Sequence, residues 1–169
     1  VLNLFAYSGG ATLAAAAGGA EVFHVDASKG MIQWAKENME LSHLEDKKIR
    51  FIVDDVIKFV EREKRRGNTY DAIIMDPPSY GRGPGGEVWK LEDEVYRLCE
   101  LCRELLTEDS LLFLINSYTT GLAPAVLTYM LSTELKEYNG TVESQEIGLP
   151  VKNTGLVLPC GASGRWEAK

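Results

Sequence analysis

Carboxylates stand at the ends of three apolar segments whose composition is typical of buried β-strands. Asp26 ends "EVFHVD", Asp54 and Asp55 end "RFIVDD", and Asp76 ends "DAIIMD". Because the carboxyl ends of parallel strands meet at one edge of a sheet, we expect these side chains to share a ligand-binding edge. Carboxylates at this edge can accept hydrogen bonds from the hydroxyl and amino groups of a ligand.

A glycine-rich turn follows the first apolar segment, "VLNLFA", and leads into a helical one. Gly9 and Gly10 allow the backbone to come close to a ligand, and the N–H groups at the start of the helix point toward it. Asp26 then ends the second strand, where an acidic residue binds the hydroxyls of a ribose. The turn, the helix and the acidic strand end together predict a site for a nucleoside cofactor.

The turn lacks the pattern that a dinucleotide favours. That pattern is G-x-G-x-x-G, whereas the run from Ala6 to Ala11 reads "AYSGGA" and holds no arginine or lysine for a phosphate. A cofactor with an adenosine and no phosphates fits better. S-adenosylmethionine is such a molecule, and its sulfonium makes a methyl group electrophilic. A nicotinamide-dependent oxidoreductase would keep the fold and stays an alternative.

Asp54 and Asp55 offer two roles at the third strand end. One carboxylate could accept a hydrogen bond from the adenine amino group, and the other could cap the helix that follows. The spacing slightly favours Asp55 for adenine, and a purely capping role for both stays open. The following residues, Ala27 after Asp26 and Val56 after Asp55, are placed on the same cofactor side.

The fourth strand runs into a stiff corner, "DPPSYG". Pro77 and Pro78 fix their own backbone angles, and Pro77 pushes Asp76 out of the α region, so the carboxylate is held at the sheet edge. Tyr80 is close enough to stack on a flat substrate. The glycine- and proline-rich stretch 77–91 is expected to be irregular, and its part 81–91 to close over the site.

Strands alternate with helices along the first four fifths of the chain. This order predicts a parallel sheet with helices on both faces, and two further extended stretches predict an antiparallel hairpin at its edge. The expected strands are 1–6, 21–26, 50–54, 71–76 and 110–116; the expected helices are about 10–18, 28–41, 55–66, 92–106 and 122–136; the hairpin strands are 141–151 and 154–161.

Length and composition fit one domain, residues 1–169, and the sequence shows no membrane-spanning or signal segment. Three cysteines, an odd number, do not form a disulfide framework, so we expect a cytoplasmic protein. The net charge of -7 means that a polyanion would need a local basic patch or another domain. The chain opens on a strand without an initiator methionine, which led us to expect a further segment before it. The charged run 61–66 is expected at the solvated end of a helix.

Other reactive residue types are better explained by packing than by chemistry. Cys99 and Cys102 form a C-x-x-C, but they repeat at helical spacing with neighbouring leucines and are expected to face the core. His24 is expected to be a core histidine with its hydrogen bonds satisfied, and His43 a loop residue. Neither histidine has the company of metal ligands, so we expect no metal site.

The segments "LNLFAYSGGATL", "VDASKGMIQWAKENMEL", "DDVIKFV" and "DAIIMDPPSYG" resemble the class I S-adenosylmethionine-dependent methyltransferases, with a Rossmann-like fold. More narrowly, they are similar to the bacterial enzymes that methylate cytosine C5 or guanine N7 of large-subunit ribosomal RNA. The resemblance implies a mostly parallel sheet of seven strands with the final pair reversed. It also implies RNA as partner, with an additional N-terminal RNA-binding part.

The same resemblance implies roles for residues of the motifs. Asp26 is placed on the ribose and Asp55 near adenine, while Asp76, Pro77, Pro78 and Tyr80 match the family's substrate-side motif. The implied cofactor contacts in the first turn come from Phe5, Ala6, Tyr7, Ser8, Gly9 and Gly10.

One departure bears on the acceptor. The cytosine-C5 enzymes of this family place a nucleophilic cysteine after the fifth strand, whereas this chain has Asn116, Ser117 and Tyr118 there. Cys160, from another strand, could occupy the position. The missing thiol favours direct in-line transfer to a nucleophilic nitrogen. A non-catalytic assembly factor that only binds the cofactor stays a second alternative.

Overall fold

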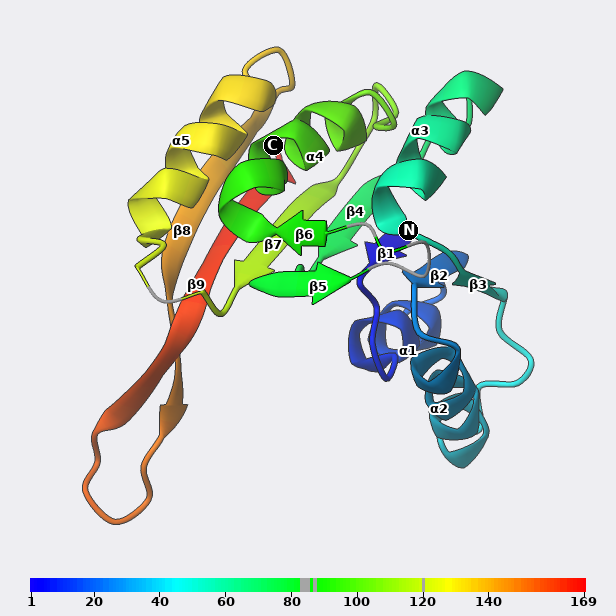
Figure 1. The fold of residues 1–169 in the computed structure, drawn as a ribbon, viewed down its shortest axis with the longest axis horizontal. Coiled ribbons are helices and arrows are strands. Elements are labelled where there is room, and N and C mark those ends of the chain that lie inside the picture. Colours follow the sequence, from blue (N-terminus) through cyan, green and yellow to red (C-terminus); the bar gives the residue numbers. More distant parts are fainter. Residues whose placement is uncertain (83–85, 87, 120) are drawn as a thin grey trace.

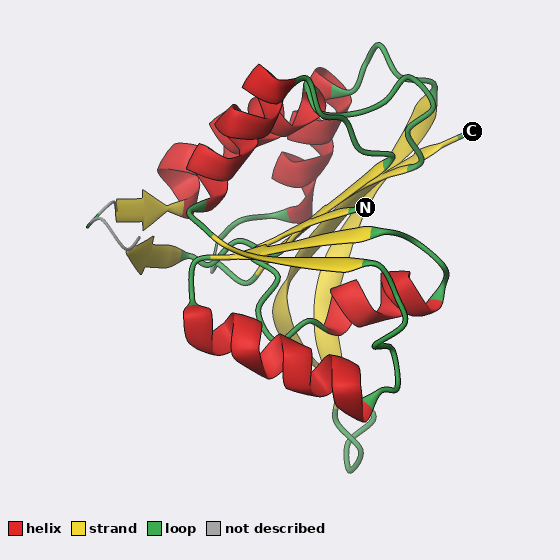
Figure 2. Cartoon of the chain, turned by 90° about the vertical axis from the view of Figure 1, so that its right-hand side faces the viewer, coloured by secondary structure: helices red, strands yellow, loops and turns green. Residues whose placement is uncertain are grey.

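A mostly parallel sheet of seven strands forms the centre of the molecule, with helices on both of its faces (Figures 1 and 2). The computed structural model describes residues 1–82, 86, 88–119 and 121–169. The strands follow the spatial order β3-β2-β1-β4-β7-β9-β8, in which β9 is antiparallel to both of its neighbours. Their bounds are β1 Leu2–Leu4, β2 Val22–Asp26, β3 Ile49–Val53, β4 Ala72–Met75, β7 Leu112–Ser117, β8 Gly140–Pro150 and β9 Val157–Ala168.

Helices α1 and α2 cover one face of the sheet, and α3, α4 and α5 cover the other (Figures 1 and 2). Their bounds are α1 Gly10–Ala17, α2 Lys29–Leu41, α3 Val56–Arg66, α4 Leu91–Arg103 and α5 Pro124–Glu134. The expected α/β fold with a terminal antiparallel hairpin is therefore confirmed.

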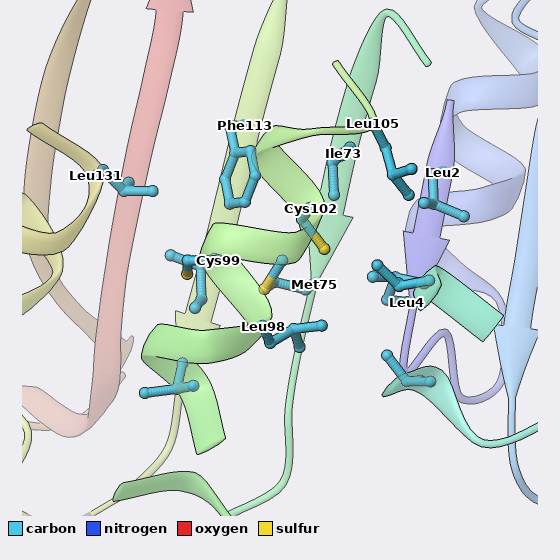
Figure 3. Close-up of a cluster of buried hydrophobic side chains, with 14 of the residues drawn as sticks. Leu2, Leu4, Ile73, Met75, Leu98, Cys99, Cys102, Leu105, Phe113 and Leu131 are labelled. Atoms are coloured by element: carbon cyan, nitrogen blue, oxygen red, sulfur yellow. The ribbon is translucent and has the colours of Figure 1, made fainter. Parts of the chain in front are cut away.

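The core lies between the sheet and α4, and both helix cysteines belong to it (Figure 3). Cys99 and Cys102 pack among leucines of α4 and side chains of the central strands, including Met75 and Phe113. Burial raises the pKa of Cys99 to about 12 and that of Cys102 well above its ordinary value. Thiols that stay protonated are poor nucleophiles, so the prediction that they serve packing is confirmed.

The expectation of an irregular segment 77–91 is partly wrong. Two short strands, β5 (Tyr80–Arg82) and β6 (Val88–Lys90), pair as an antiparallel hairpin beside the main sheet. The expected closing loop 81–91 falls partly on residues 83–85 and 87, which lie outside the described residues. The two ends of the segment pair through their backbones, and a stretch rich in glycine and proline gives no sign of this pairing in the sequence.

The last part of the expected helix 92–106 is also not helical. After Arg103 the chain turns, and the carbonyl of Leu105 accepts a hydrogen bond from the Tyr70 amide at 2.7 Å. Leu105 and Leu106 thus reach the core from a turn rather than from the helix.

The charged run 61–66 contains one buried member, against expectation. Glu63 is 2% exposed and accepts hydrogen bonds from Arg66 Nη1, Asn68 Nδ2 and Tyr70 Oη, at 2.7 to 3.0 Å. Burial alone would raise the pKa of Glu63, but the three donors outweigh it and hold the pKa below its ordinary value. A buried carboxylate is stable here because it is fully hydrogen-bonded.

The strands β8 and β9 extend well beyond the rest of the sheet as a long hairpin arm (Figure 1). Their pairing runs from Gly140 with Ala168 to Pro150 with Val157, and it shifts register between Ile147 and Gly148. Within the part of the chain that the structure covers, no helix is long and apolar enough to cross a membrane. No group of three or more metal-ligating side chains occurs among the same residues.

His24 is buried as expected, but only half of its hydrogen-bonding capacity is used. Its Nδ1 lies 2.8 Å from Thr12 Oγ1, which also accepts from Asn3 Nδ2. Its Nε2 is buried with no partner among the described residues. Burial, only partly offset by the charge of Asp26, lowers the pKa of His24 to about 4, so the ring is neutral at pH 7.

This shift predicts that the folded protein loses stability in mild acid. Between pH 6.5 and about 4 the unfolded chain binds a proton that the folded His24 does not. The free energy of unfolding should therefore fall by about 1–3 kcal/mol as the pH decreases through this window. Urea titrations at several pH values measure the effect. NMR titration of the His24 ring checks its origin, and a His24 pKa near 6.5 contradicts the prediction.

Candidate functional site

The carboxyl ends of the five parallel strands lie side by side. Leu4 of β1 pairs with Val25 of β2 and with Met75 of β4, and Met75 pairs with Ile115 of β7. Asp26 at the end of β2 pairs with Val53 of β3. The residues that follow these positions, namely Phe5, Asp54, Asp76 and Asn116, therefore share one edge with Asp26, as expected from the sequence.

The turn after β1 has an unusual backbone conformation. Phe5 (φ 53°), Tyr7 (φ 49°) and Gly9 (φ 90°) all adopt left-handed angles. Such angles cost energy at non-glycine residues and recur at functional sites. The turn is held by hydrogen bonds from the Ala6 amide to Val25 O (3.1 Å) and from Asn38 Nδ2 to Ser8 O (2.9 Å).

Two glycines of this turn differ in their surroundings. A Cβ on Gly9 would lie 3.1 Å from the Cβ of Ala35, so glycine lets α2 come close as well as allowing the positive φ. A Cβ on Gly10 would meet nothing within 4 Å. The start of α1 thus faces open space, where its N–H groups can receive a ligand.

The Asp26 carboxylate connects the first turn to the start of α2. Its Oδ2 accepts from the Tyr7 amide at 2.9 Å, and its Oδ1 accepts from the Ser28 amide at 2.8 Å. Ser28 in turn caps α2 by accepting from the Met31 amide. Because each carboxylate oxygen has a second lone pair, a fixed and half-exposed Asp26 can still accept the hydroxyls of a ribose.

Asp54 and Asp55, at the end of β3, have different hydrogen-bond partners. Asp54 accepts from the Asp55 amide and forms an ion pair with Arg62, so both of its oxygens are engaged. Asp55 caps α3 by accepting from the Lys58 amide through Oδ1 at 3.0 Å. Its Oδ2 has no partner among the described residues, which leaves Asp55 the more available carboxylate for an adenine amino group.

Val56 and Ala27, which were also expected on the cofactor side, are buried and half-buried. Val56 is 4% exposed and its side chain belongs to the core, so only its backbone can contact a ligand. Ala27 is half-buried between β2 and α2.

The D-P-P corner places one carboxylate and one ring at the edge beside the first turn. The Asp76 amide approaches the Leu4 carbonyl at 3.4 Å, which ties the corner to β1. Pro77 is buried, whereas Pro78 is exposed and Tyr80 is 52% exposed. Among the described residues nothing donates a hydrogen bond to the Asp76 carboxylate, and partial desolvation raises its pKa above the ordinary value.

The end of β7 joins this corner. Tyr118 is half-exposed, and its pKa is raised by desolvation and then by the charges of Asp76 and Cys160, so it stays a neutral phenol near Asp76. Thr119 Oγ1 donates to Ser79 Oγ at 2.7 Å and connects the loop after β7 to the corner. Cys160 lies on β9, where its thiol contacts Ile147 O at 3.4 Å.

Two cavities differ in their relation to these strand ends. One of about 360 Å³ lies beside the end of β7 and is lined by Tyr118, Glu146, Cys160 and their neighbours. A larger one of about 1140 Å³ is lined by residues before β1, β2 and β4, including Glu21 and Asp71, and so lies at the opposite edge of the sheet. Only the smaller cavity adjoins the candidate site.

Sequence reasoning missed two residues that support the site. Asn38 holds the Ser8 carbonyl of the first turn from within α2, where its position carries no signal of this role. Trp89 donates to the Pro78 carbonyl from β6, in the segment that was expected to be irregular. A tryptophan within a glycine-rich stretch was the available signal for Trp89.

Comparisons with known proteins agree with this geometry. The family model described as S-adenosylmethionine-dependent methyltransferase matches residues 1–137. The crystal structure of a SAM-dependent methyltransferase from Agrobacterium tumefaciens superposes with a TM-score of 0.95 and 43% sequence identity, over 99% of this chain and 55% of that one.

Curated relatives include two ribosomal RNA methyltransferases. The large-subunit methyltransferase I of Cronobacter sakazakii is 42% identical over 81 residues, which are 47% of this chain and 20% of the relative. The large-subunit methyltransferase K of Neisseria meningitidis is 31% identical over 118 residues, 69% of this chain and 33% of the relative. The chain thus spans a third or less of the length of these two relatives.

Proposed function

The chain belongs to the S-adenosylmethionine-dependent methyltransferases, and from this premise we propose that it methylates a base of RNA, with ribosomal RNA as the expected substrate. The observation that carries the proposal is the position of Asp76. Its carboxylate, which accepts no hydrogen bond from the described part of the chain, lies one strand from the turn that Asp26 fixes, so an acceptor and a nucleoside cofactor would meet at neighbouring strand ends.

Residues of the cofactor side fit S-adenosylmethionine. The first turn and the open start of α1 would hold its amino-acid part, Asp26 its ribose, and Asp55 together with the Val56 backbone its adenine. No basic side chain stands in the turn, which suits a cofactor without phosphates. When bound, S-adenosylmethionine supplies an electrophilic methyl group. The turn residues assigned to this side are Phe5, Ala6, Tyr7, Ser8, Gly9 and Gly10, with Ala27 and Asp54 beside them.

The acceptor side suits a flat base that carries an amino or ring N–H group. The Asp76 carboxylate would accept a hydrogen bond from that group and turn the nitrogen lone pair toward the methyl carbon, while exposed Tyr80 would stack on the ring. Pro77 and Pro78 keep the carboxylate in place. As the new N–C bond forms, the bond between the methyl carbon and the cofactor sulfur would break and its electron pair would stay on sulfur, which leaves S-adenosylhomocysteine as a neutral thioether. The proton that the nitrogen loses would pass to Asp76 or to water.

The acceptor is proposed to be a nitrogen because no thiol follows β7. Methylation of a pyrimidine C5 needs a nucleophile that adds to the ring first. Ser117 is buried and Tyr118 is a neutral phenol at the corresponding strand end. Cys160 comes near Tyr118 from β9, but its thiol is directed to the Ile147 carbonyl.

RNA as the substrate is supported by the names of the relatives and by the site, not by the charge of this chain. A net charge of -7 disfavours broad contact with phosphates. We therefore assign residues 1–169 to catalysis and expect that a further segment, placed before it in the longer protein, supplies RNA affinity.

Labelled-methyl transfer tests the proposed function. The protein, incubated with labelled S-adenosylmethionine and ribosomal RNA from a strain that lacks the gene, should transfer label to one nucleoside, which mass spectrometry of digested RNA identifies. Calorimetric titration with S-adenosylhomocysteine and with NAD⁺ separates the alternatives. Binding of NAD⁺ alone favours an oxidoreductase, and binding of S-adenosylhomocysteine without transfer to any RNA favours a non-catalytic binding module.

A further inference from the structure

Trp89 contacts both halves of the candidate site. Its indole Nε1 donates a hydrogen bond of 2.6 Å to the carbonyl of Pro78, in the D-P-P corner. Its ring packs against Phe5 of the first turn, with centroids 5.1 Å apart and planes at 53°. Trp89 is the middle residue of β6, pairs with Gly81 of β5, and is partly buried against the core. One side chain thus joins the cofactor side to the acceptor side.

The acceptor corner depends on such outside contacts for its shape. Pro77 and Pro78 have no N–H group, so the contact of the Asp76 amide with the Leu4 carbonyl, at 3.4 Å, is long and has no amide donor from either proline beside it. The carbonyls of the corner accept from the hairpin segment: Pro78 O from Trp89, and Ser79 O from the Leu91 amide at 3.1 Å. A shift of β6 would therefore also shift the corner and the neighbouring Asp76 carboxylate.

The cofactor turn depends on the same ring. Phe5 has a left-handed backbone, φ 53°, which is unfavourable for a residue with a side chain. Its ring is held by Trp89, and its backbone lies directly after Leu4, whose carbonyl faces the Asp76 amide. A ligand that fixes the turn will also fix Phe5 and restrict the indole against it.

We infer that Trp89 is a positioning residue that couples occupancy of the cofactor turn to the geometry of the acceptor corner. With the turn occupied, Phe5 holds the indole, and the indole holds the Pro78 carbonyl and the Asp76 carboxylate in the orientation that an acceptor base needs. By reciprocity, a base bound at the corner strengthens cofactor binding by the same factor. The inference rests on the proposed function for the identity of the two ligands.

Two substitutions separate the two contacts of Trp89. Trp89→Phe keeps a ring against Phe5 and removes the N–H donor. S-adenosylhomocysteine affinity should stay within about twofold of wild type, while single-turnover methyl transfer should fall about tenfold, the size expected for one lost hydrogen bond. Trp89→Leu also removes the ring pair, so the affinity should fall about threefold or more. Tyr129→Phe, an exposed aromatic position on α5, is the matched control and should change neither quantity.

Amide hydrogen exchange, followed by NMR, tests the coupling without any acceptor. S-adenosylhomocysteine at saturation should slow exchange at the amides of Ser79 and Leu91 in wild type, by about fivefold or more. In Trp89→Leu, saturated with the same ligand, this slowing should be lost, whereas the slowing at Tyr7 and Ser28, beside Asp26, should remain. Circular dichroism and thermal unfolding establish that each variant is folded.

The outcomes distinguish the coupling from the function itself. Two outcomes would overturn the inference and leave the proposed function intact. In the first, exchange at Ser79 and Leu91 slows equally in wild type and Trp89→Leu. In the second, the slowing in wild type is confined to Tyr7 and Ser28. Absence of S-adenosylhomocysteine binding to wild type would overturn both. A tenfold loss of cofactor affinity in Trp89→Phe would show that the indole N–H serves the cofactor directly, which also contradicts the assigned role.

Discussion

Replacing Asp76 with alanine is expected to reduce methyl transfer by about 100- to 1000-fold while cofactor affinity changes by less than about twofold. The carboxylate has no partner among the described residues, so its removal breaks no contact that holds the fold or the cofactor turn. In the proposed mechanism, the variant loses the group that orients the acceptor nitrogen. Single-turnover methyl transfer and calorimetric titration with S-adenosylhomocysteine measure the two quantities on the same protein.

A matched control for this variant lies on the same strand segment. Asp71 precedes β4 at the opposite edge of the sheet and accepts a hydrogen bond from Thr107, so Asp71→Ala removes an equal charge far from the strand ends. It should leave methyl transfer within about twofold of wild type. An Asp76→Ala protein with wild-type turnover would remove Asp76 from catalysis.

The pH dependence of the wild-type enzyme also depends on Asp76. Desolvation raises the pKa of its carboxyl group, so the carboxylate is protonated at a higher pH than that of an ordinary aspartate. As the pH is lowered, methyl transfer should therefore begin to fall at this higher pH.

Replacing Asp26 with alanine is expected to weaken S-adenosylhomocysteine binding by about 100-fold or more. Two effects add. The ribose hydroxyls lose a charged acceptor, and the Tyr7 and Ser28 amides lose the carboxylate that holds the first turn and the start of α2 together. Calorimetric titration gives the affinity, and thermal unfolding separates loss of affinity from loss of fold.

Asp26→Asn distinguishes these two effects. The amide keeps the shape of the side chain and one acceptor oxygen but replaces the other oxygen by a donor, which faces the Tyr7 or Ser28 amide. Its affinity should lie between wild type and Asp26→Ala. Asp46→Ala, at an exposed surface pair with Lys47, is the control for loss of one negative charge. Unchanged affinity in Asp26→Ala would exclude Asp26 from the ribose role.

The strand ends could be predicted from the sequence because the parallel sheet follows a simple rule. Three of the apolar segments end in aspartate, and the observed register places Asp26, Asp54 and Asp76 at one edge. The rule needs only the alternation of strands and helices and no knowledge of side-chain contacts. The rule therefore predicts which carboxylates share one edge of the sheet.

The supporting contacts could not be predicted because they depend on tertiary approach. Helical spacing places Glu63 on the same face of α3 as the buried Val56, Phe59 and Val60, but the donors that make its burial stable include Asn68 and Tyr70 from beyond the helix. The division of roles between Asp54 and Asp55 follows from Arg62, two turns along α3. Trp89 lies in a segment whose composition suggests no regular structure, and its partners, Phe5 and Pro78, come from two different strand ends.

The placement of β9 between β7 and β8 sets an order on folding. Strand β7 pairs with β9 over its whole length, yet β9 is separated from it by α5 and β8. During synthesis, β7 must therefore remain an open edge until β9 has left the ribosome. Such edges are prone to pair with other chains, and pairings between distant segments form slowly. The loop after β7, which carries Tyr118 and contacts the corner, thus gains its β9 neighbour last, so we expect the D-P-P corner to reach its final structure after the first turn.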